Sequence, residues 1–323
     1  MRRLISITVL LTLICAALSV GASHVENLWS ALLHPGSNVI LWDIRIPRVI
    51  ATVIVGAALG VAGLIAQGAC NNPLAEPSIL GTSAGASLGA VVAILTGIAQ
   101  VGSIGAIVCG ALGALCATAI TFKLASLRGN LSSFALVIVG IAVSAILTAV
   151  VGVASVMVTR ADARSISFWS FGSFALITQE NLIGLTLFTI IGLVIAYRIA
   201  PMLDRLSLGD ATAFHLGVDV SRARFLSLIS ISLLAGGAVS TVGSVAFIGL
   251  AAPHIARFIY GPQHRQLVVE SAIIGSALVI VADTLCRTIA QPNELPIGLI
   301  TSFIGAPVLI ALVTVHNNVW RSQ

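Results

Sequence analysis

Long apolar runs fill most of this chain, and they limit its possible folds more than any other feature. The runs lie near residues 4–20, 49–67, 79–98, 101–122, 132–158, 182–200, 225–242, 245–259, 268–289 and 297–315. Only 8% of the 323 residues are charged, against roughly 25% in ordinary soluble domains. So few charges do not cover a water-facing surface of this size. The sequence therefore predicts an integral membrane protein.

Helices explain these runs better than a membrane β-barrel does. A spanning helix needs ~20 apolar residues and satisfies its backbone groups internally, whereas a barrel needs alternating strands. The runs here are unbroken and rich in Ala, Leu, Ile, Val and Gly. We predict an all-α membrane fold with about ten transmembrane helices in one polytopic domain, residues 1–323. The run at 4–20 resembles a signal peptide, but we interpret it as the first transmembrane helix because everything downstream is membrane-embedded.

The basic residues give an orientation through the positive-inside rule. A cytoplasmic N-terminus and ten crossings place eleven of the 16 basic residues inside: Arg2, Arg3, Lys123, Arg128, Arg198, Arg205, Arg222, Arg224, Arg257, Arg265 and Arg321. The net charge of +5 reflects this bias, and it does not imply nucleic-acid binding. The five remaining arginines fall outside: Arg45, Arg48, Arg160, Arg164 and Arg287.

Three of the outer arginines flank membrane helices. Arg45 and Arg48 precede the second helix, and Arg287 follows the ninth. Arginines at helix ends commonly snorkel to the interface. The alternative is an electropositive outer rim that receives an acidic partner. The residues alone support both interpretations equally.

The segment 201–224 is the largest cytoplasmic feature, and it is too polar to span a membrane. Connectors rarely exceed ~12–15 residues without a role. Its apolar residues form short amphipathic turns separated by Gly209 and Gly217. We expect two short helices on the cytoplasmic face that act as a docking element.

The stretch Gly81-Thr82-Ser83-Ala84-Gly85 matches the G-x-S-x-G pattern of a hydrolase. A nucleophile elbow needs a strand–turn–helix context, and this chain offers no sheet. An intramembrane protease pairing Ser83 with His254 is also disfavoured, because His254 lies near the cytoplasmic boundary. Gly81, Gly85 and Gly89 recur at every fourth residue, which is typical of close helix packing in membranes. We therefore predict a helix–helix contact here.

Broken membrane helices with loops on both sides suggest a transporter or channel, but no energy source for transport is visible in the chain. Coupling acids inside the membrane are nearly absent, with Asp283 the nearest case. There is no P-loop motif, and Lys123 is the only lysine. The five cysteines are scattered without metal-ligand spacing. We expect no cofactor or metal in this chain and a separate ATPase that docks on 201–224.

Four long stretches resemble the FecCD-type permease family, the membrane subunits of ABC importers for iron–siderophores, heme and vitamin B12. They are "RIPRVIATVIVGAALGVAGLIAQGACNNPLAEPSILGTSAGASLGA" (45–90), "LSLGDATAFHLGV" (206–218), "VAFIGLAAPHIARFIYGPQHR" (245–265) and "ADTLCRTIAQPNELPIGLITSFIGAPV" (282–308). The resemblance covers nearly the whole chain. It implies a fold similar to the vitamin B12 permease, a type II ABC importer.

The resemblance also implies partners and cargo. The expected partners in a bacterial cytoplasmic membrane are a second permease subunit (identical or a close paralogue), two ATPase subunits that bind ATP and Mg, and an outer substrate-binding protein. The expected cargo is an iron chelate, siderophore or heme, with a corrinoid as the alternative. A stand-alone secondary transporter is the rival class.

The matching motifs imply roles for three groups of residues in this chain. Docking of the binding protein falls to Arg45, Arg48 and Arg287. Coupling to the ATPase falls to Leu206, Leu208, Gly209, Asp210, His215, Leu216 and Gly217. The inner gate falls to Ser132, Ser133 and Phe134, where Phe134 is bulkier than the small polar residue of the vitamin B12 permease.

Overall fold

The computed structural model describes residues 2–21, 31, 33–34, 36, 38–100, 103–127, 132–156, 170–291 and 293–307. These residues form helices and turns and contain no strand. The main elements are α1 (Arg2–Ser19), η1 (Ile40–Arg45), α3 (Ile46–Ala69), η2 (Pro77–Leu80), α4 (Thr82–Leu95), α5 (Ile104–Ser126), α6 (Ser133–Val156), α8 (Gln179–Leu206), α9 (Asp210–His215), α10 (Val220–Val242), α11 (Ile248–Tyr260) and α12 (His264–Thr288).

The predicted all-α membrane fold is confirmed. Seven helical stretches in the described residues are long and apolar enough to cross a membrane: α1, η1 with α3, α5, α6, α8, α10 and α12. Two shorter apolar helices are α4 and Ile297–Pro307, and the 13-residue helix α11 carries the run near 245–259. Together they correspond to the ten apolar runs. Arg160 and Arg164, predicted outside, and Arg128 and Arg321, predicted inside, lie beyond the described residues.

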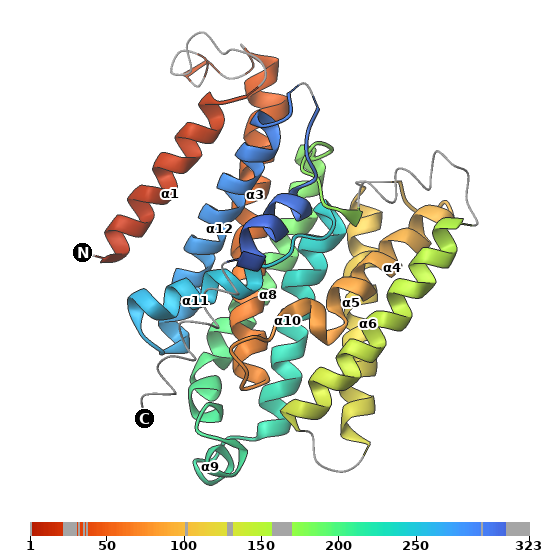
Figure 1. Cartoon of the computed structure of the whole chain (residues 1–323), viewed down its shortest axis with the longest axis vertical. Helices are drawn as coiled ribbons and strands as arrows, with labels where there is room; N and C mark the ends of the chain where they lie inside the picture. Colours follow the sequence, from red (N-terminus) through yellow and green to blue (C-terminus); the bar gives the residue numbers. More distant parts are fainter. Residues whose placement is uncertain are drawn as a thin grey trace.

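The helices form a bundle in which α3 and α10 are the most enclosed (Figure 1). Their most apolar 18-residue windows are 78% and 83% buried, whereas those of α1 and α6 are 6% and 17% buried. Helix α1 packs mainly on α12, and α6 packs on α4 and α5. Helices α1 and α6 therefore form two outer flanks that offer apolar surface to lipid or to another chain.

Glycines allow several of these helices to touch backbone to backbone. A Cβ added at Gly56 of α3 would lie 2.4 Å from the carbonyl oxygen of Gly275 in α12. On α4, added Cβ atoms at Gly85 and Gly89 would lie 2.5 Å and 2.2 Å from carbonyl oxygens of α5. Such approaches need residues without side chains. Gly81 is different, because it precedes α4 with a φ of 88° and acts as its N-cap.

The two ends of the bundle are distinct. We call the end that carries α9 the inner end, which the basic residues predict to be cytoplasmic. The outer end carries the last turn of α1, the start of α3 and the last turn of α12 (Figure 1). Both candidate sites lie at these ends.

The polar segment 201–224 differs from its prediction. It contains one separate short helix, α9, instead of two. Helix α8 continues to Leu206 because Leu203 and Leu206 are fully buried in the core. The backbone turns at Gly209 (φ 97°) and again at Gly217 (φ 79°), and α10 begins at Val220. Positive φ angles of this kind suit glycine, so α9 is set off by a glycine turn on each side.

Candidate functional site

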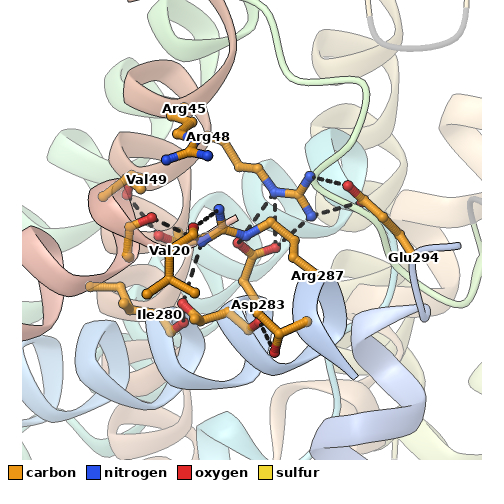
Figure 2. Close-up of polar contacts among 12 residues, drawn as sticks. Val20, Arg45, Arg48, Val49, Ile280, Asp283, Arg287 and Glu294 are labelled. Atoms are coloured by element: carbon orange, nitrogen blue, oxygen red, sulfur yellow. Dashed lines mark hydrogen bonds and ion pairs between the residues drawn. The ribbon is translucent and has the colours of Figure 1, made fainter. Parts of the chain in front are cut away.

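The outer end brings together the three arginines that were predicted to dock a partner. Figure 2 shows Arg45, Arg48 and Arg287 close to one another, with Asp283 and Glu294 between and beside them. Arg45 and Arg48 come from η1 and α3, and Arg287 and Asp283 come from the last two turns of α12. We call these five residues the outer cluster.

Two arginines of the outer cluster cap helix α1. Arg45 Nη1 donates to the carbonyl oxygens of Leu18 and Ser19 at 2.7 Å and 3.2 Å. Arg287 donates to the carbonyl oxygens of Ala17 and Val20 at 3.3 Å and 3.2 Å. The last carbonyls of a helix have no intrahelical partner and carry the negative end of its dipole. The two guanidinium groups therefore fix the end of α1 against α3 and α12.

Arg48 is held by two carboxylates. Its Nε and Nη2 donate to Asp283 Oδ1 at 3.1 Å and 2.9 Å, and its Nη1 and Nη2 donate to Glu294 at 2.8 Å and 2.9 Å (Figure 2). Asp283 also lies 3.1 Å from Arg287 Nε and so joins both cations. Paired, charge-assisted contacts of this type are the strong class of hydrogen bond.

The burial of the outer cluster differs from the expected electropositive rim. Arg45, Arg48 and Arg287 are only 4%, 6% and 7% exposed, and Asp283 is 2% exposed. A buried guanidinium needs a counter-charge and hydrogen-bond acceptors, and here the chain supplies them itself. Glu294 is the more accessible member, with 36% of its side chain exposed. In the sequence Asp283 stands out only as a lone acid near a membrane helix, and Glu294 carries no such signal.

The inner end carries the residues assigned to ATPase coupling. The segment from Leu206 to Val218 has a buried side and an apolar exposed side. Ala213 and Val218 are buried, whereas Leu208, Phe214 and Leu216 are 61%, 69% and 51% exposed. Three large apolar side chains on one short segment form an uncovered patch of the kind that marks interaction sites.

The residues assigned to the inner gate lie at the start of α6. Ser132 caps this helix, since its Oγ accepts from the amide of Ala135 at 3.1 Å. Ser133 Oγ accepts from Arg224 Nη2 at 2.8 Å. Phe134 is 75% exposed and points away from the packed core. Ser133 therefore contacts a buried arginine, which the sequence predicted only as an inside basic residue.

Other polar contacts at the inner end were not anticipated. Asp204 accepts from the backbone amide of His264 at 2.9 Å, and it lies 2.8 Å from His264 Nδ1. Arg257 Nη2 donates to Gln67 Oε1 at 3.1 Å. Both pairs join residues that are far apart in the sequence, so periodicity and motif spacing give no sign of them. They join α8 to α12 and α3 to α11.

The hydrolase interpretation of Ser83 has no support in the described residues. Ser83 lies in the first turn of α4, after the short helix η2, and no strand precedes it. Gly85, which completes the pattern, contacts α5. The G-x-S-x-G match therefore coincides with a helix-packing surface.

These observations define a multi-pass helical membrane protein with an uncovered apolar segment at its inner end. The family model of the FecCD transport family matches residues 8–315. The chain therefore belongs to the FecCD transport family.

Three curated relatives illustrate the range of this family. The chain is 36% identical to the iron(3+)-hydroxamate import system permease protein FhuB of Bacillus subtilis, covering 92% of this chain and 78% of that protein. It is 35% identical to the hemin transport system permease protein HmuU of Yersinia pestis, covering 96% and 93%. It is 34% identical to the vitamin B12 import system permease protein BtuC of Escherichia coli, covering 97% and 94%.

Solved structures agree on the architecture. A metal-chelate type ABC transporter in an inward-facing conformation superposes with a TM-score of 0.83 and 26% identity, covering 96% of this chain and 97% of that one. The PsaBC structure from Streptococcus pneumoniae superposes with a TM-score of 0.58 at 15% identity, covering 88% and 93%, and supports the fold alone. The predicted family and its vitamin B12 permease-like fold are confirmed.

Proposed function

We propose that this chain is the permease subunit of an ATP-driven importer that moves an iron chelate, a siderophore or heme, across the cytoplasmic membrane. The proposal rests on one observation: in this member of the FecCD family, the inner end carries an uncovered apolar segment. Its residues Leu208, Phe214 and Leu216 are exposed. An ATPase subunit docked there supplies the energy that the membrane helices do not provide. ATP and Mg bind to that ATPase.

The assembly we propose contains two permease subunits, two ATPase subunits and an outer binding protein. The exposed flank of α6 supports a second permease subunit. Its large apolar side chains are uncovered along the whole helix: Phe134, Ile138, Ile141, Ile146, Val150, Val153 and Val156. Facing α6 helices in a pair would line a central pathway whose inner end lies at Ser132, Ser133 and Phe134.

The outer cluster is the proposed docking site for the binding protein. It holds the guanidinium groups of three arginines and the carboxylates of Asp283 and Glu294. Glu294 reaches the surface and holds Arg48. A carboxylate of the binding protein would join or replace Glu294 there, because guanidinium groups pair well with two carboxylate oxygens.

Reconstituted uptake tests this function. The permease, its ATPase and its binding protein are placed in liposomes, and uptake of radiolabelled ferric hydroxamate, heme and cobalamin is compared with and without ATP. We expect ATP-dependent uptake of an iron chelate. Uptake of cobalamin alone would identify the corrinoid alternative. Uptake driven by an ion gradient without the ATPase would instead show a secondary transporter.

A further inference from the structure

Arg224 is a fully buried arginine whose partners come from three different elements. It lies in the second turn of α10 and is 0% exposed. Its Nε donates to the carbonyl oxygen of Ala69 at the end of α3, at 3.2 Å. Its Nη2 donates to Ser133 Oγ at the start of α6, at 2.8 Å, and to Asp210 Oδ1 at the start of α9, at 2.9 Å. One side chain therefore joins the central helix α3, the gate helix α6 and the coupling helix α9.

The contacts to α6 and α9 share a single nitrogen atom. A guanidinium Nη carries two hydrogens, and in Arg224 one is directed to Ser133 and the other to Asp210. The planar guanidinium fixes the angle between these two directions. If Asp210 moves, Arg224 must turn about its own bonds to follow, and the hydrogen bond to Ser133 then lengthens or breaks.

The two partners of this ion pair differ in burial, so one of them can move more easily than the other. Asp210 is 50% exposed and stands at the edge of the molecule, whereas Arg224 is 0% exposed. A carboxylate that moves outward is rehydrated by water, but the buried guanidinium is not, so Arg224 has the stronger need for its partners. Asp210 begins α9, which is set off by turns at Gly209 and Gly217. The movable end of the link is therefore the one that carries the exposed docking residues.

We propose that Arg224 is the positioning residue that transmits displacement of α9 to the start of α6. This inference rests on the proposed function, since it takes α9 as the ATPase contact and Ser133 as part of the gate. In this arrangement the ATPase pulls or releases Asp210, Arg224 reorients, and Ser133 gains or loses its charged donor. The Ala69 carbonyl holds the guanidinium to α3 during this change.

The test compares transport with ATP consumption in the complete reconstituted importer. The variants are Asp210→Asn, Ser133→Ala and Arg224→Lys, which keeps the charge but loses the fork that reaches both partners. Matched controls away from the link are Glu180→Gln and Arg198→Lys at exposed positions and Ser126→Ala at a half-buried one, where the hydroxyl donates to its own helix. Cargo imported per ATP hydrolysed is measured with whichever of ferric hydroxamate, heme or cobalamin the wild-type complex imports.

We expect Asp210→Asn and Arg224→Lys to lower the cargo imported per ATP by roughly tenfold, the effect of losing one charged hydrogen bond. Hydrolysis should fall much less than uptake does, whereas all readouts of the controls should stay near wild type. Because Asp210 and Ser133 act through one nitrogen, the double variant should be no worse than the more severe single variant.

Three outcomes are decisive. Wild-type cargo-to-ATP ratios in Asp210→Asn and Arg224→Lys would overturn the link while leaving the importer function intact. A fall of uptake and hydrolysis in equal proportion, together with a lowered melting temperature, would show a purely structural arginine and would also overturn it. A wild-type complex that imports nothing with ATP would refute the proposed function first, which is a distinguishable result.

Discussion

Arg48 at the outer end and Arg224 at the inner end are both buried arginines, but their counter-charges differ. Arg48 pairs with Asp283, which is 2% exposed and lies in α12, one of the helices most tightly packed on α3. Arg224 pairs with Asp210, which is 50% exposed and begins a short helix between glycine turns. A buried carboxylate on a rigid helix makes a fixed clamp. A half-exposed carboxylate on a short, separately hinged helix makes a contact that is able to change.

The largest expected effect is at the centre of the fixed clamp. Asp283→Asn leaves Arg48 and Arg287 without their shared buried charge, and breaking such a pair costs about 3–5 kcal/mol. We expect loss of most folded protein in detergent, measured by yield, size-exclusion profile and melting temperature. Asp43→Asn, an exposed acid in η1 at the same end, is the control and should melt like wild type. A stable Asp283→Asn protein would show that the outer cluster is not a clamp.

The next prediction compares the two arginines directly. Arg48→Met removes one of the two cations that the buried Asp283 joins and leaves it with Arg287 alone, for which we expect a cost of about 3 kcal/mol. Arg224→Met leaves Asp210 free to hydrate, so the loss is restricted to its hydrogen bonds, about 1–2 kcal/mol. The melting temperature of Arg48→Met should therefore lie below that of Arg224→Met. The reverse order would contradict the distinction between a fixed and a changeable site.

Much of this architecture was predictable from the sequence, because transmembrane helices are specified locally by apolar length. All ten apolar runs correspond to helices in the described residues. The glycine period was also informative, since Gly85 and Gly89 contact α5. Gly81 departs from the pattern because a φ of 88° places it before the helix.

The side-chain partners were not predictable in the same way. Arg48 and Asp283 are 235 residues apart, and Arg48 and Glu294 are 246 apart, so no spacing rule connects them. Arg224 stands near the end of an apolar run, where an arginine usually reaches the interface. Its burial depends on how α3, α6 and α9 meet around it, which is a property of the tertiary structure. The sequence did show that Arg224 is an ionisable residue next to a membrane helix. Such residues are candidates for a functional site.

A glycine substitution tests the packing beneath the outer cluster while leaving the charged residues of the cluster unchanged. Gly56→Ala places a methyl group 2.4 Å from the Gly275 carbonyl, so α3 and α12 must move apart. Overpacking of this kind costs about 1–3 kcal/mol, and it shifts Arg48 away from Asp283 while both residues remain. Gly152→Ala on α6, where an added Cβ meets nothing within 4 Å, is the control. We expect Gly56→Ala to lower the melting temperature and Gly152→Ala to leave it unchanged. Equal melting temperatures of the two variants would contradict this prediction.

The smallest expected effect concerns the one outer acid that reaches the surface. Glu294→Gln removes a charge that is 36% exposed, so its loss should cost about 1 kcal/mol or less. Arg48 keeps Asp283 and stays in place, but its Nη1 loses its carboxylate and its Nη2 keeps only that of Asp283. If the binding protein presents an acid to this cluster, removing the internal competitor should tighten its binding to the permease, measured by titration in nanodiscs. Asp43→Asn again serves as the control for a lost acid at this end. Unchanged or weakened binding by Glu294→Gln would place the docking contact elsewhere and leave the outer cluster as a clamp alone.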